Sequence, residues 1–155
     1  MKSPVVLESA QTYEKTAINY WCERCLEDGR EPACPVTGVV LKSLELKPNI
    51  GLAGAIDEWV NRNIEVQIKR AVEYLSEDSS SMDSIDRSLD SIYKISEEHP
   101  MSRYRVRNEG IVVLILKLLR NSSKVIGSLL KSKALMVLFS MAKDEESRVS
   151  VFNLL

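Results

Sequence analysis

The chain has 155 residues, of which 45% are hydrophobic and 28% are charged, a composition typical of a folded globular protein rather than a disordered one. Its 21 basic and 22 acidic residues leave a net charge of −1, which gives no global electrostatic reason to bind nucleic acid or an acidic membrane. The longest apolar run, at 111–116, is far shorter than the ~20 residues of a membrane span. The N-terminal sequence has no apolar core typical of a secretory signal, and an odd count of three cysteines favours a reducing compartment, so we expect a cytoplasmic or nuclear protein.

Residues 1–62 predict a small mixed domain. The β-branched run at 4–9 predicts a strand, and the helical spacing of apolar residues at 12–29 predicts a helix, with Thr12 as its N-cap and Gly29 as its stop. A loop rich in proline and glycine follows, then a second short strand at 39–43. Asn49 is placed to cap another helix at 50–63.

Residues 63–155 predict helices throughout. Apolar residues repeat at helical spacing in 64–75 and again in 85–95, where a serine cluster supplies the preceding cap and Pro100 the break that follows. Shorter and longer helices are then predicted at 101–110, 111–123, 125–144 and 145–155. Their order favours an α-solenoid with a period of roughly 40 residues, the armadillo range, over an irregular helical bundle. Only one repeat would be complete, so we expect a truncated array.

The three cysteines all lie within residues 21–38. A structural zinc site needs four ligands, and the only histidine, His99, is far along the sequence. Cys22 and Cys25 fit the core stripe of the predicted helix, together with Ile18 and Trp21, and lie at its acidic far end rather than at the N-terminus that a redox pair prefers. A nucleophilic role for Cys34 would need a histidine base within reach. We therefore interpret the cysteines as packing residues, with no metal and no cofactor.

The same region resembles the U-box of plant U-box/armadillo ubiquitin ligases. The shared pattern has a strand, a Thr-Tyr-Glu segment, an Ile-x-x-Trp segment on the following helix, a Cys-Pro-x-Thr loop and a Leu-x-Pro-Asn segment. The matching positions are Pro4, Val5, Leu7, Thr12, Tyr13, Glu14, Ile18, Trp21, Cys34, Pro35, Thr37, Leu41, Leu46, Pro48, Asn49, Leu52, Ile56 and Trp59.

This resemblance implies a mainly α protein, with a small α+β, zinc-free, RING-like U-box at 1–62 followed by an all-α, armadillo-like solenoid stub at 63–155. It implies recruitment of a ubiquitin-conjugating enzyme charged with ubiquitin, through Trp21 on the central helix and through Pro35, Val36 and Gly38 in the second loop. Such a ligase forms no covalent intermediate and contributes orientation, so no residue is expected to be catalytic. The helical repeats would bind the protein substrate. Peripheral membrane association is conceivable for amphipathic helices, but helix packing explains their apolar stripes more simply.

The sequence also departs from the U-box pattern. The first loop of the family, with its Cys-Pro-[Ile/Leu]-Thr contact, would precede Met1, so we expect an incomplete recruitment groove. Ala10 stands where the family has glycine, which is costly if the turn needs a positive φ. Lys15 replaces arginine and loses its bidentate geometry, which leaves the stabilising roles of Glu8 and Glu14 open. An alternative function is therefore a non-catalytic, armadillo-type interaction adaptor that carries a U-box remnant.

Overall fold

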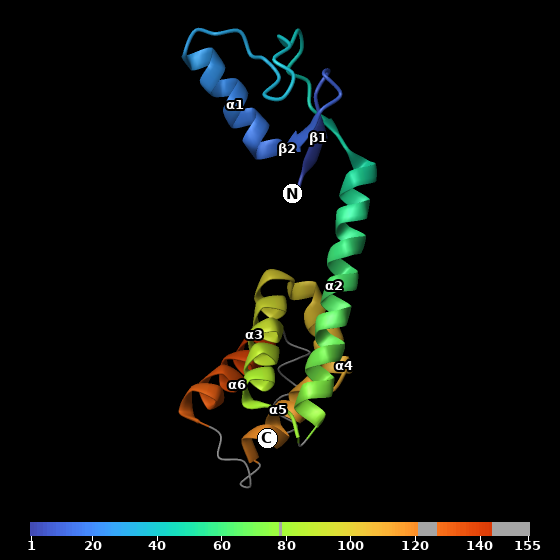
Figure 1. The fold of residues 1–155 in the computed structure, drawn as a ribbon, viewed down its shortest axis with the longest axis vertical. Coiled ribbons are helices and arrows are strands. Elements are labelled where there is room, and N and C mark those ends of the chain that lie inside the picture. The colour runs from blue at the N-terminus through green and yellow to red at the C-terminus, as the bar shows by residue number, and fades with distance from the viewer. Residues whose placement is uncertain (78, 121–126, 144–155) are drawn as a thin grey trace. The chain divides into compact units, whose positions relative to one another are not determined.

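The computed structural model describes residues 1–77, 79–120 and 127–143. The chain divides into two compact units, Met1–Asn61 and Arg62–Leu155, and Figure 1 shows the strands in the first and most of the helices in the second. Helix α2, Ile50–Ser76, begins in the first unit and ends in the second.

A three-stranded antiparallel sheet opens the first unit. Strand β1, Pro4–Val6, lies between β2, Thr12–Glu14, and β3, Lys47–Pro48. Val5 pairs with Tyr13 on one side and with Pro48 on the other. Proline is tolerated in β3 because an edge strand need not donate every backbone hydrogen bond. The strand predicted at the N-terminus is confirmed.

The central helix begins later than the sequence predicts. Helix α1 spans Lys15–Glu27, whereas Thr12, the predicted N-cap, lies in β2. The hydroxyl of Thr12 accepts a hydrogen bond from Asn49 Nδ2 at 3.1 Å, so it ties the strand to the start of α2 instead of capping α1. The predicted end is confirmed, because Gly29 follows the helix with a φ of +67°.

The second predicted strand is wrong. Of residues 39–43, Val40 alone forms an isolated bridge, to Ala33. Val39 and Val40 are both exposed while Leu41 is buried, so the segment lacks the alternation of a strand with one buried face. The paired segment is instead β3, which the sequence analysis missed.

The core of the first unit is a small cluster shared by the sheet, α1 and the loop after it. Its buried members are Val5, Leu7, Ile18, Cys22, Cys34 and Leu41, with Tyr13 and Leu46 packed against them. Cys25 is buried as well, and all three cysteines are free thiols. Their interpretation as packing residues is confirmed. Trp21, however, is 39% exposed, so its assignment to the core stripe is wrong.

Helix α2 joins two segments that the sequence analysis treated separately, 50–63 and 64–75. The cap is confirmed, since Asn49 Oδ1 accepts the Leu52 N–H at 3.0 Å. No glycine or proline interrupts residues 55–75, so nothing in that stretch stops the helix. Its buried residues, Ile64, Ile68 and Ala71, lie in the second unit.

The second unit is helical in its described residues. It contains α3, Met82–Glu98; a 3₁₀ turn η1, Pro100–Ser102; α4, Arg103–Asn108; α5, Ile111–Arg120; and α6, Ser128–Met141. Three predicted boundaries are confirmed: Ser81 caps α3 by accepting the Ser84 N–H, Pro100 follows α3, and Gly110 ends α4 with a φ of +76°. The helix predicted at 145–155 lies outside the described residues.

Helix α3 organises this unit by packing against α6, while α5 packs on α4 and α6. Ile85, Leu89, Ile92 and Ile95, the stripe predicted for α3, are all buried. Whether the helices repeat as an armadillo solenoid stays a prediction. Among the described residues, no helix is long and apolar enough to cross a membrane.

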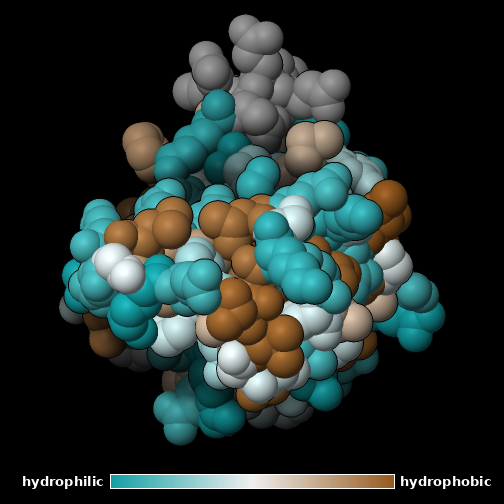
Figure 2. Space-filling model, turned by 90° about the horizontal axis from the view of Figure 1, so that it is seen from above, coloured by the Kyte–Doolittle hydropathy of each residue, from teal (hydrophilic) through white to brown (hydrophobic). Residues whose placement is uncertain are grey.

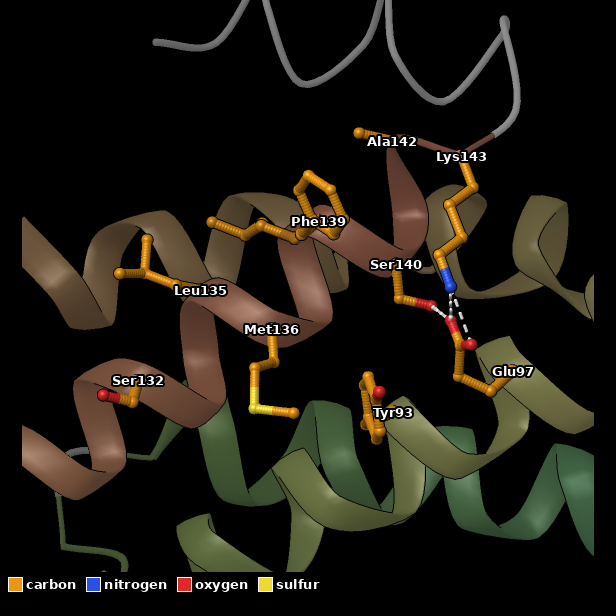
Figure 3. Close-up of a pocket in the computed structure, with 10 residues that line it drawn as sticks. Tyr93, Glu97, Ser132, Leu135, Met136, Phe139, Ser140, Ala142 and Lys143 are labelled. Carbon is orange, nitrogen blue, oxygen red and sulfur yellow. Dashed lines mark hydrogen bonds and ion pairs between the residues drawn. The ribbon is translucent and has the colours of Figure 1, made fainter.

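Ion pairs border the contact between α3 and α6. Lys133 Nζ lies 2.8 Å from carboxylate oxygens of both Asp86 and Asp90. Lys143 pairs with Glu97 at 2.6 Å, and the Ser140 hydroxyl donates to the same carboxylate, as Figure 3 shows.

An apolar groove opens beside these ion pairs. Its lining includes Tyr93 from α3 and three residues from α6, Leu135, Met136 and Phe139. Phe139 is 75% exposed and Leu135 is 58% exposed. Two large apolar side chains therefore face solvent on α6.

Candidate functional site

The site begins with a tight turn in loop two, which we define as residues 28–46. Cys34 N donates to Val39 O and Gly38 N donates to Cys34 O, both at 2.8 Å. Gly38 has a φ of +70°, a conformation that glycine adopts without steric cost. These bonds close the segment 34–39 and hold Pro35 and Val36 at its outer side, where both are exposed.

Tyr13 anchors the turn from the sheet. Its hydroxyl lies 3.1 Å from Cys34 Sγ and accepts the Val36 N–H at 3.3 Å. Burial and the Cys34 contact raise the pKa of Tyr13, which keeps the phenol protonated and able to donate. A strand residue thus fixes the conformation of loop two.

The Cys34 sulfur is electrostatically unusual. Burial by itself would raise its pKa, but the hydroxyls of Thr37 and Tyr13 are among the groups that favour the thiolate and lower the pKa to about 6. The side chain is nevertheless only 1% exposed, so the sulfur serves as a hydrogen-bonding centre inside the loop rather than as a surface nucleophile.

Trp21 connects the central helix to the same loop. Its indole Nε1 donates to Ala33 O at 2.8 Å, two residues before Pro35. The structure therefore brings the predicted Trp21 next to the loop that carries the predicted Pro35, Val36 and Gly38. With 39% of its surface exposed, the indole both holds the loop and remains accessible.

The carboxylates of Glu8 and Glu14 both accept hydrogen bonds from the backbone. Glu8 accepts the backbone N–H of Lys42 at 2.5 Å and of Ser43 at 3.2 Å, which fixes the far end of loop two. Glu14 accepts the N–H of Lys2 and of Ser3, and these bonds lower its pKa. Both carboxylates are thus satisfied by backbone donors, whichever cation stands at position 15.

The exposed apolar surface extends beyond the predicted residues. Val36 is 70% exposed, and Val39 and Val40 are also exposed. Hydrophobic side chains at the surface, among hydrophilic ones, are visible in Figure 2. Both valines were expected in a strand, so neither was among the predicted contact residues. The position of Gly38 just before them was the available signal, since a glycine with positive φ ends the turn there.

The described residues contain no cluster of three or more histidine, cysteine or acidic side chains able to hold a metal ion. Cys22 has a raised pKa, chiefly because it is buried, which favours the neutral thiol over the thiolate that binds metal. The geometry offers exposed apolar side chains on a loop that hydrogen bonds hold in place.

Comparison with known proteins finds a domain match and several relatives. Residues 1–65 match the U-box domain. The chain is 31% identical to U-box domain-containing protein 24 of Oryza sativa subsp. japonica over 94% of its length, and 34% identical to U-box domain-containing protein 43 of Arabidopsis thaliana over 97%. It is also 26% identical to the Arabidopsis E3 ubiquitin-protein ligase PUB23, over 99% of its length and 39% of that protein. The chain spans 18% of the length of each of the first two relatives. Residues 1–65 thus carry a U-box domain match, and the chain is homologous to plant U-box domain-containing proteins.

Proposed function

We propose that this chain acts in ubiquitin-protein ligation, as a U-box that recruits a ubiquitin-conjugating enzyme and promotes ubiquitin transfer to substrate lysines. The observation that carries the proposal is the surface of loop two. Within the residues that match the U-box, Trp21 is bonded to the loop backbone, and Pro35, Val36 and Gly38 stand exposed beside it.

The rigidity of loop two would favour binding of a partner. Tyr13, Trp21 and Glu8 hold the backbone of the loop at three positions, so little conformational entropy would be lost on binding. The exposed apolar side chains would supply the buried contact area, with Trp21 as the aromatic anchor that protein interfaces favour.

The proposed contribution to catalysis is orientation. The charged conjugating enzyme carries ubiquitin as a thioester, and the substrate amine attacks its carbonyl while the thiolate of that enzyme leaves. A U-box that restrains the enzyme and its ubiquitin raises the effective concentration of the reactive arrangement. No side chain of this chain needs to form a bond, and no cofactor is involved.

Residues 63–155 would then present protein partners, including the substrate, as an armadillo-like array. The apolar groove beside α3 and α6 supports a partner-binding role, because Leu135 and Phe139 are large and exposed. We place the proposed domain boundary near residue 62 and the protein in the cytoplasm or nucleus.

The deciding experiment is an autoubiquitination assay of the folded chain with a panel of conjugating enzymes. We expect ubiquitin chains, and their loss in Pro35→Ala and Trp21→Ala. Trp59→Ala is the matched control, because it removes an equally large side chain that is 66% exposed on α2. Equal activity in wild type and Pro35→Ala would remove loop two from the interface.

A second candidate function is that of a non-catalytic interaction adaptor, and the groove beside α6 is the observation that favours it. The same assay separates the two candidates. A folded chain that forms no ubiquitin conjugates with any conjugating enzyme, yet still binds protein partners through its helical residues, would establish the adaptor and exclude the ligase.

A further inference from the structure

A polar cleft lies between α2 and α3, within the second unit. It has a volume of about 400 Å³. Its α2 wall comes from residues spread over about three turns, Asn63, Gln67, Arg70 and Tyr74, which share one helical face. The α3 wall comes from Ser84, Arg87 and Ser91.

Small residues explain why the two helices leave space here. Ala71 and Ser88 belong to the lining and are only 1% and 5% exposed, so they form the floor of the cleft. Neither side chain is long enough to fill the gap between the helices. The Ser88 hydroxyl donates to Ser84 O at 2.8 Å, which satisfies it within α3.

Part of the acidic charge of α3 is neutralised from α6. Asp86 and Asp90 both pair with Lys133, and at ~100° per residue they lie on the side of α3 away from Ser84 and Ser88 of the cleft. Of the described residues that line the cleft, none is acidic, while Arg70 and Arg87 both line it. Arg87 Nε donates to Asp83 O at 3.3 Å, which orients its guanidinium.

We propose that this cleft binds a phosphorylated side chain of a partner polypeptide. A phosphate monoester carries a charge of about −1.5 to −2 and three acceptor oxygens, which suits two guanidinium groups better than one carboxylate does. The hydroxyls of Tyr74 and Ser91 are further donors around the same space.

The amide side chains favour a peptide over a free anion. Asn63 and Gln67 each offer a donor and an acceptor, and together they match the N–H and C=O groups of an extended backbone rather than phosphate oxygens alone. The cleft also has more room than one phosphate group fills. The proposal concerns the second unit alone and does not depend on ligase activity.

The test is an NMR titration of the whole ¹⁵N-labelled chain. The probes are the peptide Gly-Ala-phosphoserine-Ala-Gly, the same peptide without phosphate, and inorganic phosphate, all at one fixed ionic strength. We expect the phosphopeptide to shift the amides of Arg70, Tyr74 and Arg87, and to bind at least about tenfold more tightly than either comparison probe.

Single substitutions test whether binding depends on the two arginines of the cleft or on the positive charge of the surface in general. Arg70→Gln and Arg87→Gln are each expected to weaken phosphopeptide binding about tenfold or more, whereas Lys131→Gln, which removes one exposed charge from α6, should change it less than twofold. Unchanged resonances elsewhere would show that each variant is folded. Equal weakening by all three substitutions, shifts centred outside the cleft, or no preference for the phosphopeptide would overturn the proposal.

Discussion

The hydroxyl of Tyr13 provides a direct way to test whether loop two is held from the sheet. In Tyr13→Phe the ring keeps its place against the core, but the Val36 N–H loses its acceptor and Cys34 Sγ loses a partner. The exposed surface of Pro35 and Val36 is chemically unchanged. The substitution therefore loosens the loop without altering the groups that would contact a partner.

The expected cost follows from the hydrogen bonds removed. One neutral hydrogen bond contributes about 1 kcal/mol, and this is a minimum, because the lowered pKa of Cys34 favours the thiolate, to which a hydrogen bond contributes more. A loss of about 1 kcal/mol corresponds to roughly a fivefold larger population of the opened loop. Amide hydrogen exchange measured by NMR should therefore accelerate about fivefold at Val36 and Gly38, since exchange reports local opening.

Tyr20→Phe is the matched control, because Tyr20 lies on α1 of the same unit and is 63% exposed. It should leave exchange in loop two unchanged. If Tyr13→Phe also leaves exchange at Val36 unchanged, the tyrosine does not hold the loop. If exchange accelerates equally throughout the first unit, the hydroxyl supports the whole core rather than the turn. Either result would refute the reasoning.

Three further predictions concern stability. The pKa of Cys34 is about 6 in the fold against an ordinary value of 9.0, so the unfolded chain binds the proton more tightly. The free energy of unfolding should therefore rise with pH between 6 and 9, and the contribution of Cys34 to it should be absent below pH 6. Urea unfolding at pH 6.5 and 8.5 should show this slope in wild type and not in Cys34→Ala, and equal slopes would contradict the lowered pKa. Ile92→Ala, at a position with 0% exposure in α3, should cost about 2–5 kcal/mol in urea unfolding followed by circular dichroism; a cost under ~1 kcal/mol would argue against tight packing there. Ala10 has a φ of +59°, which costs an L-residue about 1–2 kcal/mol, whereas the greater loss of backbone entropy on folding costs glycine only about 0.5–1 kcal/mol. Ala10→Gly should therefore raise the urea midpoint of unfolding slightly. A lower midpoint would contradict the left-handed turn.

Helix ends in the second unit were predictable because they depend on local chemistry. The Ser81 cap, the break at Pro100 and the stop at Gly110 each act within a few residues of the chain. The buried stripe of α3 was predictable for the same reason, since helical periodicity places its isoleucines and leucine on one face.

The sheet was harder to predict because its pairing depends on residues far apart in sequence. Thr12 could cap a helix locally, but pairing of its segment with β1 places it in a strand. Lys47 and Pro48 have no strand signal of their own and become β3 only because Val5 and Val6 lie opposite them. Tertiary pairing overrides local preference in both places.

The residues of the candidate site could be proposed from the sequence, and their role as contacts stays a prediction, but the way the fold holds them could not be foreseen. The resemblance identified Trp21 and Pro35, but only the structure shows that the indole N–H bonds the Ala33 carbonyl. The roles of Tyr13 and Glu8 as supports involve residues 23 to 35 positions away. No spacing rule in the sequence connects them.

Loop two also separates the side chains that support it from the side chains that it displays. Tyr13, Trp21 and Glu8 grip the backbone of the loop, whereas the side chains of Val36 and Val39 point outward at 70% and 57% exposure. Substitutions at the two valines should therefore change little in folding free energy, because surface changes of this kind usually stay within about 0.5 kcal/mol. Under the proposed function, the loop could acquire a different partner preference through its displayed positions while its supports stay fixed, which would make this turn a suitable place for recognition to diverge or to be engineered.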